Sequence, residues 1–268
     1  MNYSKLLDTI KEGLGFDDIV MNLNLDETSL LYGENDSERT IQKWLGTFIA
    51  INEKDMREEI GNITIHTIRC WAAIQTIGSN GLCDECDAHS QMMIDLFTDI
   101  FNVKEGPTPE DVQRYPELYD GNDLKDWIVF QDLGDIEVRE EIQELFSSEH
   151  PYLILHNVHL VTDVFIKEKY RGRNIGHAMI AFMLREMSSS PSDLFVAYPW
   201  PFSCEDTYPD REFTENEIAE AVRKNELYFQ NIGFKVVRDI THNRRDRNLH
   251  AISGEDALML LDISNNLT

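Results

Sequence analysis

The chain has 268 residues, of which 42% are apolar and 10% aromatic, as in an ordinary globular protein with enough side chains for a core. This composition excludes a disordered polymer and a small disulfide scaffold, and no apolar run approaches the ~18 residues of a membrane span. Acidic residues follow soon after Met1, which predicts that there is no signal peptide and that the protein is cytoplasmic.

The formal net charge of −25 is concentrated in the first half of the chain. Residues 1–150 carry 32 acidic against 11 basic residues, a balance of −21, and residues 151–268 carry 17 against 13, a balance of −4. A field of this sign repels phosphate backbones, so nucleic acid is not an expected partner. Cationic small molecules or lysine-rich protein surfaces would be attracted. The alternative is that the charge serves solubility alone.

The first 150 residues contain helical and strand-like patterns without an internal repeat. We treat residues 1–40 as an N-terminal extension. The elements expected up to residue 150 are a helix over 5–14, an alternating stretch over 19–25, strands over 44–51 and 63–74, a helix ending near Phe101 and capped by Asp87 or Ser90, and an acidic helix over 136–146.

The cysteines allow a metal site to be considered. Cys83 and Cys86 are separated by two residues, and Cys70 or His66 could complete a tetrahedron. A second close pair of ligands is missing, and the acidic neighbours of Cys83 raise thiol pKa values. We therefore predict no metal, and reduced thiols at the start of a helix.

Strands and helices alternate after residue 150. The expected elements are a buried strand over 153–166 with a bulge near His156 and Asn157, a helix over 175–187, a strand over 194–198, a helix over 215–231, and strands over 234–238 and 258–263. This order predicts an α/β-layered (α+β) fold with a mixed central sheet flanked by helices.

A turn rich in glycine and arginine joins the buried strand to the helix over 175–187. Gly172 and Gly176 would let a ligand approach the backbone, and Arg171 and Arg173 add positive charge to an acidic chain. Free N–H groups at the helix start and the helix dipole would attract an anion such as a pyrophosphate. The alternative is a strand–helix turn that merely needs glycine.

Residues 170–176 resemble the acetyl-CoA-binding motif of the GNAT superfamily of N-acetyltransferases, written Arg/Gln-x-x-Gly-x-Gly/Ala. Asn174 replaces the usual middle glycine, and asparagine tolerates left-handed backbone better than most residues. Residues 227–234, which end in Gly-Phe, look like a helix-to-strand segment of the same family. Phe229 stands where the family commonly has its acidic tyrosine, and Tyr228 precedes it.

The resemblance implies a GNAT-like domain over 41–268, with the motif-bearing part at 152–268. It implies acetyl-CoA as co-substrate and transfer of acetyl to a primary amine of a small molecule or a protein, with a cationic acceptor favoured by the acidic balance. The cofactor-binding residues that we expect are Val164, Phe165, Ile166, Arg171, Gly172, Arg173, Asn174, Ile175, Gly176 and Asn225. Asn225 has the alternative of a hydrogen-bonded core amide.

Two residues are the catalytic candidates. Asp163, on the central strand, is the first candidate for the base that deprotonates the amine, with His159 on the same strand as a second. Tyr228 is the candidate acid, and Tyr198 is its alternative. A CoA-binding fold that has lost catalysis and acts as a sensor or interaction module is a competing hypothesis, as is an acidic mimic of nucleic acid.

Overall fold

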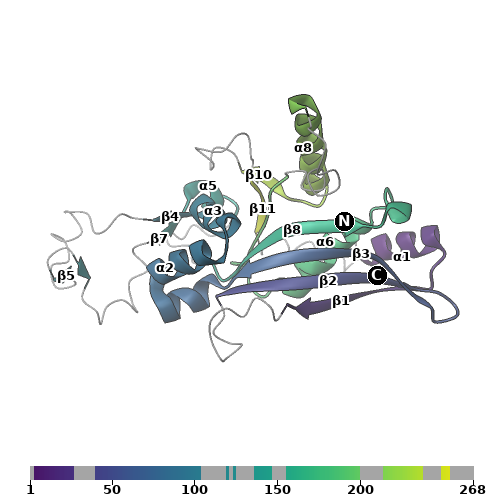
Figure 1. Ribbon diagram of the computed structural model, residues 1–268, viewed down its shortest axis with the longest axis horizontal. Coiled ribbons are helices and arrows are strands. Elements are labelled where there is room, and N and C mark those ends of the chain that lie inside the picture. Colours follow the sequence, from purple (N-terminus) through teal and green to yellow (C-terminus); the bar gives the residue numbers. More distant parts are fainter. Residues whose placement is uncertain are drawn as a thin grey trace.

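Seven strands form a central sheet (Figure 1). The computed structural model describes residues 3–26, 40–103, 119–120, 123–124, 136–146, 155–199, 214–237 and 249–253. The strands of this sheet are β1 (Asp18–Leu25), β2 (Ile41–Ile51), β3 (Arg57–Ile68), β8 (Val158–Ile166), β9 (Leu194–Ala197), β10 (Lys235–Val237) and β11 (Leu249–Ser253). They lie in the order β1-β2-β3-β8-β9-β11-β10. Neighbours are antiparallel except for β8 and β9, which are parallel. The mixed sheet predicted from the sequence is confirmed.

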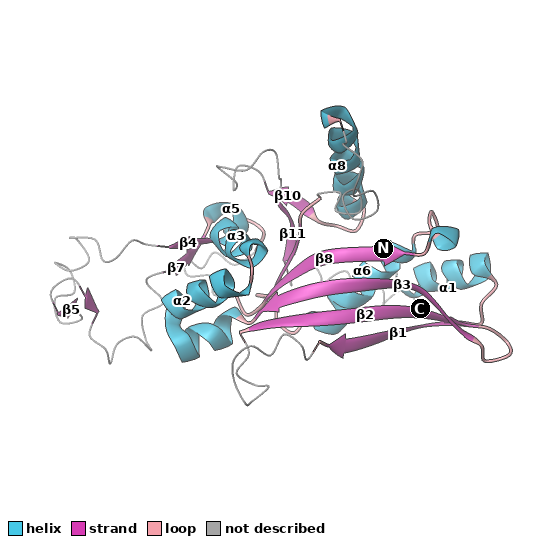
Figure 2. Ribbon diagram, viewed as in Figure 1, coloured by secondary structure: helices cyan, strands magenta, loops and turns pink. Residues whose placement is uncertain are grey.

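Helices cover both faces of this sheet. The described helices are α1 (Tyr3–Leu14), α2 (Cys70–His89), α3 (Gln91–Ile100), α5 (Glu140–Gln143), α6 (Ile175–Met187) and α8 (Glu215–Gln230). Figure 2 shows α6 behind the strands, α1 toward one end of the sheet, and α2 with α3 toward the other. Two short ladders lie outside the main sheet: β4 (Phe101–Val103) with β7 (Ile136–Val138), and β5 (Tyr119–Asp120) with β6 (Asp123–Leu124). None of the described helices is both long and apolar enough to span a membrane.

Two hydrophobic cores follow from the alternation of side chains along the strands. On β3, Ile63 and Ile65 belong to the core beneath α6, whereas Ile68 belongs to the core beneath α2 and α3. All three are fully buried. The sheet is thus the middle layer of three, and each of its faces is closed by its own helices.

Residues 1–40, treated as an extension in the sequence analysis, contribute to this same sheet. β1 pairs with β2 along its whole length, from Asp18 opposite Ile51 to Leu25 opposite Trp44. Ile10 of α1 is buried in the core beneath α6. The described part of this segment is therefore built into the fold that carries the motif.

Several local predictions are confirmed by the structure. α6 has the expected bounds, and Ser90 caps α3 by accepting a hydrogen bond from the backbone of Met93 at 3.3 Å. Thr214 and Glu217 form the expected capping box of α8. In each case the residues that predicted the helix end lie within one helical turn of that end.

Other predictions of elements are wrong. The strand predicted over 63–74 ends at Ile68, because its pairing with β8 stops there and α2 begins at Cys70. Cys83 and Cys86 lie in the second half of α2 and not at a helix start. The helix predicted over 136–146 is a short strand, β7, followed by α5.

The end of the sheet also differs. The structure has a strand, β11, over Leu249–Ser253 that was not predicted, whereas the strand predicted over 258–263 lies outside the described residues. The sequence of β11, LHAIS, has little of the β-branched and aromatic character that marks a strand. Pairing on both sides, with β9 and β10, stabilises it instead.

The bulge in β8 lies at a different place from the predicted one. β8 begins at Val158, and its register against β3 shifts between Val161 and Asp163, so that Thr162 is the extra residue. His156 and Asn157, where the bulge was predicted, instead precede the strand and contact Asp193.

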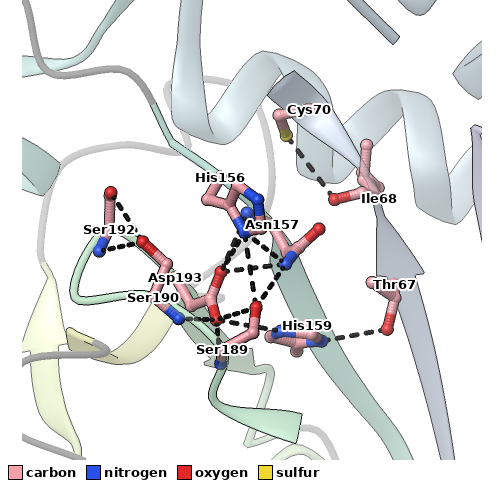
Figure 3. A network of polar contacts seen from close by, with 10 residues as sticks. All are labelled: Thr67, Ile68, Cys70, His156, Asn157, His159, Ser189, Ser190, Ser192 and Asp193. Atoms are coloured by element: carbon pink, nitrogen blue, oxygen red, sulfur yellow. Dashed lines mark hydrogen bonds and ion pairs between the residues drawn. The ribbon is translucent and has the colours of Figure 1, made fainter. Parts of the chain in front are cut away.

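A buried carboxylate joins the beginnings of β8 and β9 (Figure 3). Asp193 is fully buried and accepts hydrogen bonds from the backbone N–H groups of Asn157 (3.1 Å), Ser189 (2.7 Å) and Ser190 (2.9 Å). Burial by itself would raise the pKa of Asp193. The side chain of His159, 4.0 Å away, and these backbone donors outweigh burial and lower the pKa to about 2. We call this arrangement the Asp193 clamp.

Replacing Asp193 with Asn should lower the free energy of unfolding by about 3 kcal/mol at pH 7, because buried donors lose a charged acceptor. The folded-state pKa lies below the ordinary value of 3.8. The contribution of the carboxylate is therefore complete above pH ~4 and is lost as the pH falls toward 2, an acid-dependent loss of about 2 kcal/mol. Urea unfolding at pH 7 and at pH 2 measures both effects. The exposed Asp87→Asn is the control, and equal losses in the two variants would contradict the role of the clamp.

Candidate functional site

The pairing of the parallel strands β8 and β9 stops where β9 ends, at the end opposite the Asp193 clamp. They pair from Val158 opposite Leu194 to Val161 opposite Ala197. Beyond Val161, β8 continues to Ile166, and within the described residues this part of its backbone pairs with β3 alone. The bulge at Thr162 falls where this pairing stops. We call residues 162–166 of β8, which have no neighbouring strand on this side within the described residues, the open edge.

An exposed turn leads from the open edge into α6. After a short 3-10 helix over Glu168–Tyr170, the residues from Arg171 to Asn174 are all exposed. Gly172 has φ of 76°, and a Cβ atom placed there would meet no atom within 4 Å. The turn therefore uses glycine for its left-handed backbone and leaves open space beside it.

Asn174 is the N-cap of α6 and adopts the left-handed conformation, with φ of 59° and ψ of 17°. Its side chain forms no capping hydrogen bond. The first N–H groups of an α-helix have no partner inside the helix, so those of Ile175, Gly176 and His177 depend on a side chain, water or a ligand. Asparagine thus supplies the backbone conformation for which the family motif has glycine.

The two arginines of the turn are held by backbone carbonyl groups. Arg171 donates from Nε to the carbonyl of Ile166 at 2.9 Å, and Arg173 donates from Nη1 to the carbonyl of Gly13 at 2.9 Å. Each of these bonds uses one of the five N–H groups of a guanidinium. The bonds fix two positive charges beside the start of α6, at the end of the open edge and next to α1.

Tyr228 of α8 lies over the first turn of α6. A Cβ atom at Gly176 would overlap the hydroxyl of Tyr228 and would lie 3.4 Å from Cγ1 of Val164. Gly176 is therefore needed for the close approach of the tyrosine. Burial raises the pKa of Tyr228, so its hydroxyl stays protonated at neutral pH. Phe229, by contrast, points into the core against Phe234.

The base candidates lie apart from each other. Val164 and Ile166 pack on the α6 side of the sheet, and alternation places exposed Asp163 and Phe165 on the other side. His159 is only 2% exposed and stacks on Phe195, with its Nδ1 atom 2.9 Å from the hydroxyl of Thr67. Of the two candidates, Asp163 is next to the opening and accessible, whereas His159 belongs to the closed end.

Two further candidates have protein partners in the structure. Asn225 donates its amide to the carbonyl of Pro199 at 3.1 Å, which connects α8 to the end of β9. Tyr198 donates its hydroxyl to Asp99 of α3 at 2.6 Å, on the side of the sheet away from Tyr228. Of the three tyrosine and asparagine candidates, Tyr228 is the one in contact with the start of α6.

The described thiols have the character of core residues. Burial raises the pKa of Cys70 and brings that of Cys86 to about 12, and burial together with Asp84 and Asp87 raises that of Cys83. They therefore stay protonated at neutral pH. Within the described part of the chain, no three His, Cys, Asp or Glu residues are grouped so as to hold a metal ion.

A residue that the sequence analysis did not select also belongs to the site. His177, the third residue of α6, packs its ring against that of Tyr228, with ring centroids 4.3 Å apart. The available signal was a polar aromatic residue directly after the last glycine of the motif.

No protein-family model, curated protein or solved structure matches this chain significantly. The functional interpretation therefore depends on the geometry of the open edge, the arginine turn and the start of α6.

Gly176→Ala should destabilise the protein by about 2 kcal/mol, because the new methyl group and the Tyr228 hydroxyl cannot occupy the same space. In a Tyr228→Phe background the same substitution should cost less than half as much. A double-mutant cycle by urea unfolding measures the coupling. Equal costs in the two backgrounds would show that Tyr228 does not lie over Gly176.

Proposed function

We propose that this protein binds acetyl-CoA and transfers its acetyl group to a primary amine. The observation that carries the proposal is the continuity of three features: the open edge of β8, the exposed turn with Arg171 and Arg173, and the start of α6 without a side-chain cap. Each suits a different part of one extended ligand.

The residues of the turn suit a diphosphate. Backbone N–H groups of the first turn of α6, the positive end of its dipole and two guanidinium groups would all act on the same anion. The open space beside Gly172 admits it. The chain as a whole has a net charge of −25. The two arginines are therefore a local concentration of positive charge, and their hydrogen bonds to backbone carbonyl groups hold them at this position.

The open edge suits an extended chain that carries amides. A strand edge with free N–H and C=O groups pairs with such a chain in the manner of an added strand. Val164, Phe165 and Ile166 would provide that edge, with the carbonyl of Ile166 at its end already accepting the hydrogen bond from Arg171 of the turn. Acetyl-CoA, when bound, would supply the activated thioester.

Two side chains would move protons on opposite sides of the sheet. An alkylammonium with a pKa of about 10 must lose a proton before it can attack, and the exposed carboxylate of Asp163 would accept it directly or through water. The hydroxyl of Tyr228 stays protonated because burial raises its pKa, so it would donate to the departing sulfur. The acidic balance of the chain favours a cationic acceptor, either a small amine or an amine of a protein.

One observation favours a second candidate function. The close contact between Tyr228 and Gly176 fills the space directly over the first turn of α6. A protein that binds CoA without catalysis, as a sensor or interaction module, would be consistent with a tyrosine that blocks this space. Binding without transfer to any amine would support that function.

Binding is tested by calorimetry with acetyl-CoA. We expect a micromolar dissociation constant for the native chain and a weakening of about tenfold or more, equal to about 1.4 kcal/mol, in the double variant Arg171→Gln, Arg173→Gln. Arg185→Gln, in the last turn of the same helix, is the matched control and should bind normally. Absence of binding at millimolar acetyl-CoA would overturn the proposal.

Transfer is tested by the release of free thiol from acetyl-CoA with spermidine and a lysine-rich peptide as acceptors. Asp163→Asn should lower kcat by about 10²-fold with little change in acetyl-CoA binding, because a general base acts on the chemical step. Tyr228→Phe should lower kcat as well. A variant of Asp163 with native kcat at pH 7 would assign the base elsewhere.

A further inference from the structure

His177 is a buried histidine without a polar partner. It is 8% exposed, and within the described residues neither Nδ1 nor Nε2 has a hydrogen-bond partner. A neutral imidazole always carries one N–H donor and one acceptor nitrogen, so both go unused. A buried polar group in this state loses its hydration without a compensating bond, and an apolar side chain of similar size would pack at lower cost.

The position of His177 directs its ring toward the start of α6. Cα–Cβ bonds in a helix tilt toward the N-terminus, and the side chain of the third helical residue reaches back to the N-cap, as it does in a capping box. The ring of Tyr228 packs against that of His177, and the Tyr228 hydroxyl lies over Gly176. The unpartnered imidazole is therefore part of the inner wall of the first turn.

We propose that His177 is the buried donor of an anion site at the start of α6, and that its imidazole takes up a proton when a diphosphate group binds there. This inference rests on the proposed function for the identity of the ligand. It adds a residue that the motif does not include, and a linkage between ligand binding and pH.

The surroundings of His177 disfavour its charged form when no anion is bound. Burial lowers its pKa, and the positive end of the helix dipole acts in the same direction. The residue of α8 that faces His177 is Tyr228, whose hydroxyl is neutral. The carboxylate of the same helix at Glu226 lies 3.9 Å from a different histidine, His250. The adjoining turn contributes Arg171 and Arg173, and α1 contributes Lys11, which is paired with Asp18, together with the exposed carboxylates Asp8 and Glu12.

A bound diphosphate reverses this balance. Two negative charges beside the first turn would favour the imidazolium, so the pKa of His177 is higher in the complex than in the free protein. Binding therefore takes up a proton in the pH range between the two values, and affinity falls as the pH rises through that range. The imidazolium would also donate from both nitrogens, which gives the unused polar atoms a partner.

The experiment uses dephospho-CoA, because it keeps the diphosphate but lacks the 3′-phosphate that itself titrates near pH 6. We expect its dissociation constant to rise about tenfold between pH 6 and pH 8 in the native chain. Calorimetry in buffers of different ionisation enthalpy counts the protons, with an uptake of roughly half a proton or more near pH 6.5. His177→Gln should show no uptake and a pH-independent affinity.

His250→Gln is the control, since His250 is also buried and its nitrogens have no hydrogen-bond partner among the described residues, although Nε2 lies 3.9 Å from Glu226. It should keep the pH dependence of the native chain. A measurement on the native chain covers the case in which His177→Gln fails to fold: the ring ¹⁵N resonances of His177 should move from neutral to protonated values when dephospho-CoA is added at pH 6.5.

The outcomes separate the two proposals. Absence of dephospho-CoA binding at millimolar concentration would overturn the proposed function. Binding without proton uptake, or uptake that persists in His177→Gln, would overturn the role of His177 and leave the proposed function intact.

Discussion

The unequal length of the parallel neighbours β8 and β9 is the constraint on which the rest of the structure depends. Parallel neighbours pair evenly along their length unless something ends the ladder. Here the Asp193 carboxylate holds the two strands together at one end, and the bulge at Thr162 changes the course of β8 a few residues later. Because β9 ends at Ala197 while β8 continues to Ile166, the open edge, the turn and the start of α6 follow one another along the chain beyond the paired part.

The turn before α6 is positively charged, whereas the chain as a whole is negatively charged. The chain has an excess of acidic residues, whereas helix dipole, uncapped N–H groups and two arginines act together in this one turn. These arginines are held by carbonyl oxygens at Ile166 and Gly13, so their positions are set by backbone that belongs to the sheet and to α1. Positive charge positioned in this way costs little conformational entropy when a ligand binds, which is the usual advantage of a preorganised site.

The contact between α6 and α8 links the turn to the rest of the domain. Gly176 allows the hydroxyl of Tyr228 to approach, the His177 ring packs at a tilt against the same tyrosine ring, and Asn225 connects α8 to the end of β9 through Pro199. An imidazole with no hydrogen-bond partner among the described residues is an unusual filling for a helix–helix contact, because an apolar side chain packs there at lower cost. Their presence at this contact is the physical reason for connecting it with ligand binding.

The sequence by itself determined the local elements of the site: the bounds of α6, the capping box of α8, and the glycine and arginine turn. Their signals depend on residues a few positions apart. The tertiary structure decided the place of the bulge, the strand β11, the incorporation of β1 into the sheet, and the choice of Tyr228 rather than Phe229 at the start of α6. These depend on pairing and packing between segments far apart in the chain. A short strand such as LHAIS is stabilised by its neighbours, and a histidine without a partner is recognised only when its surroundings are known.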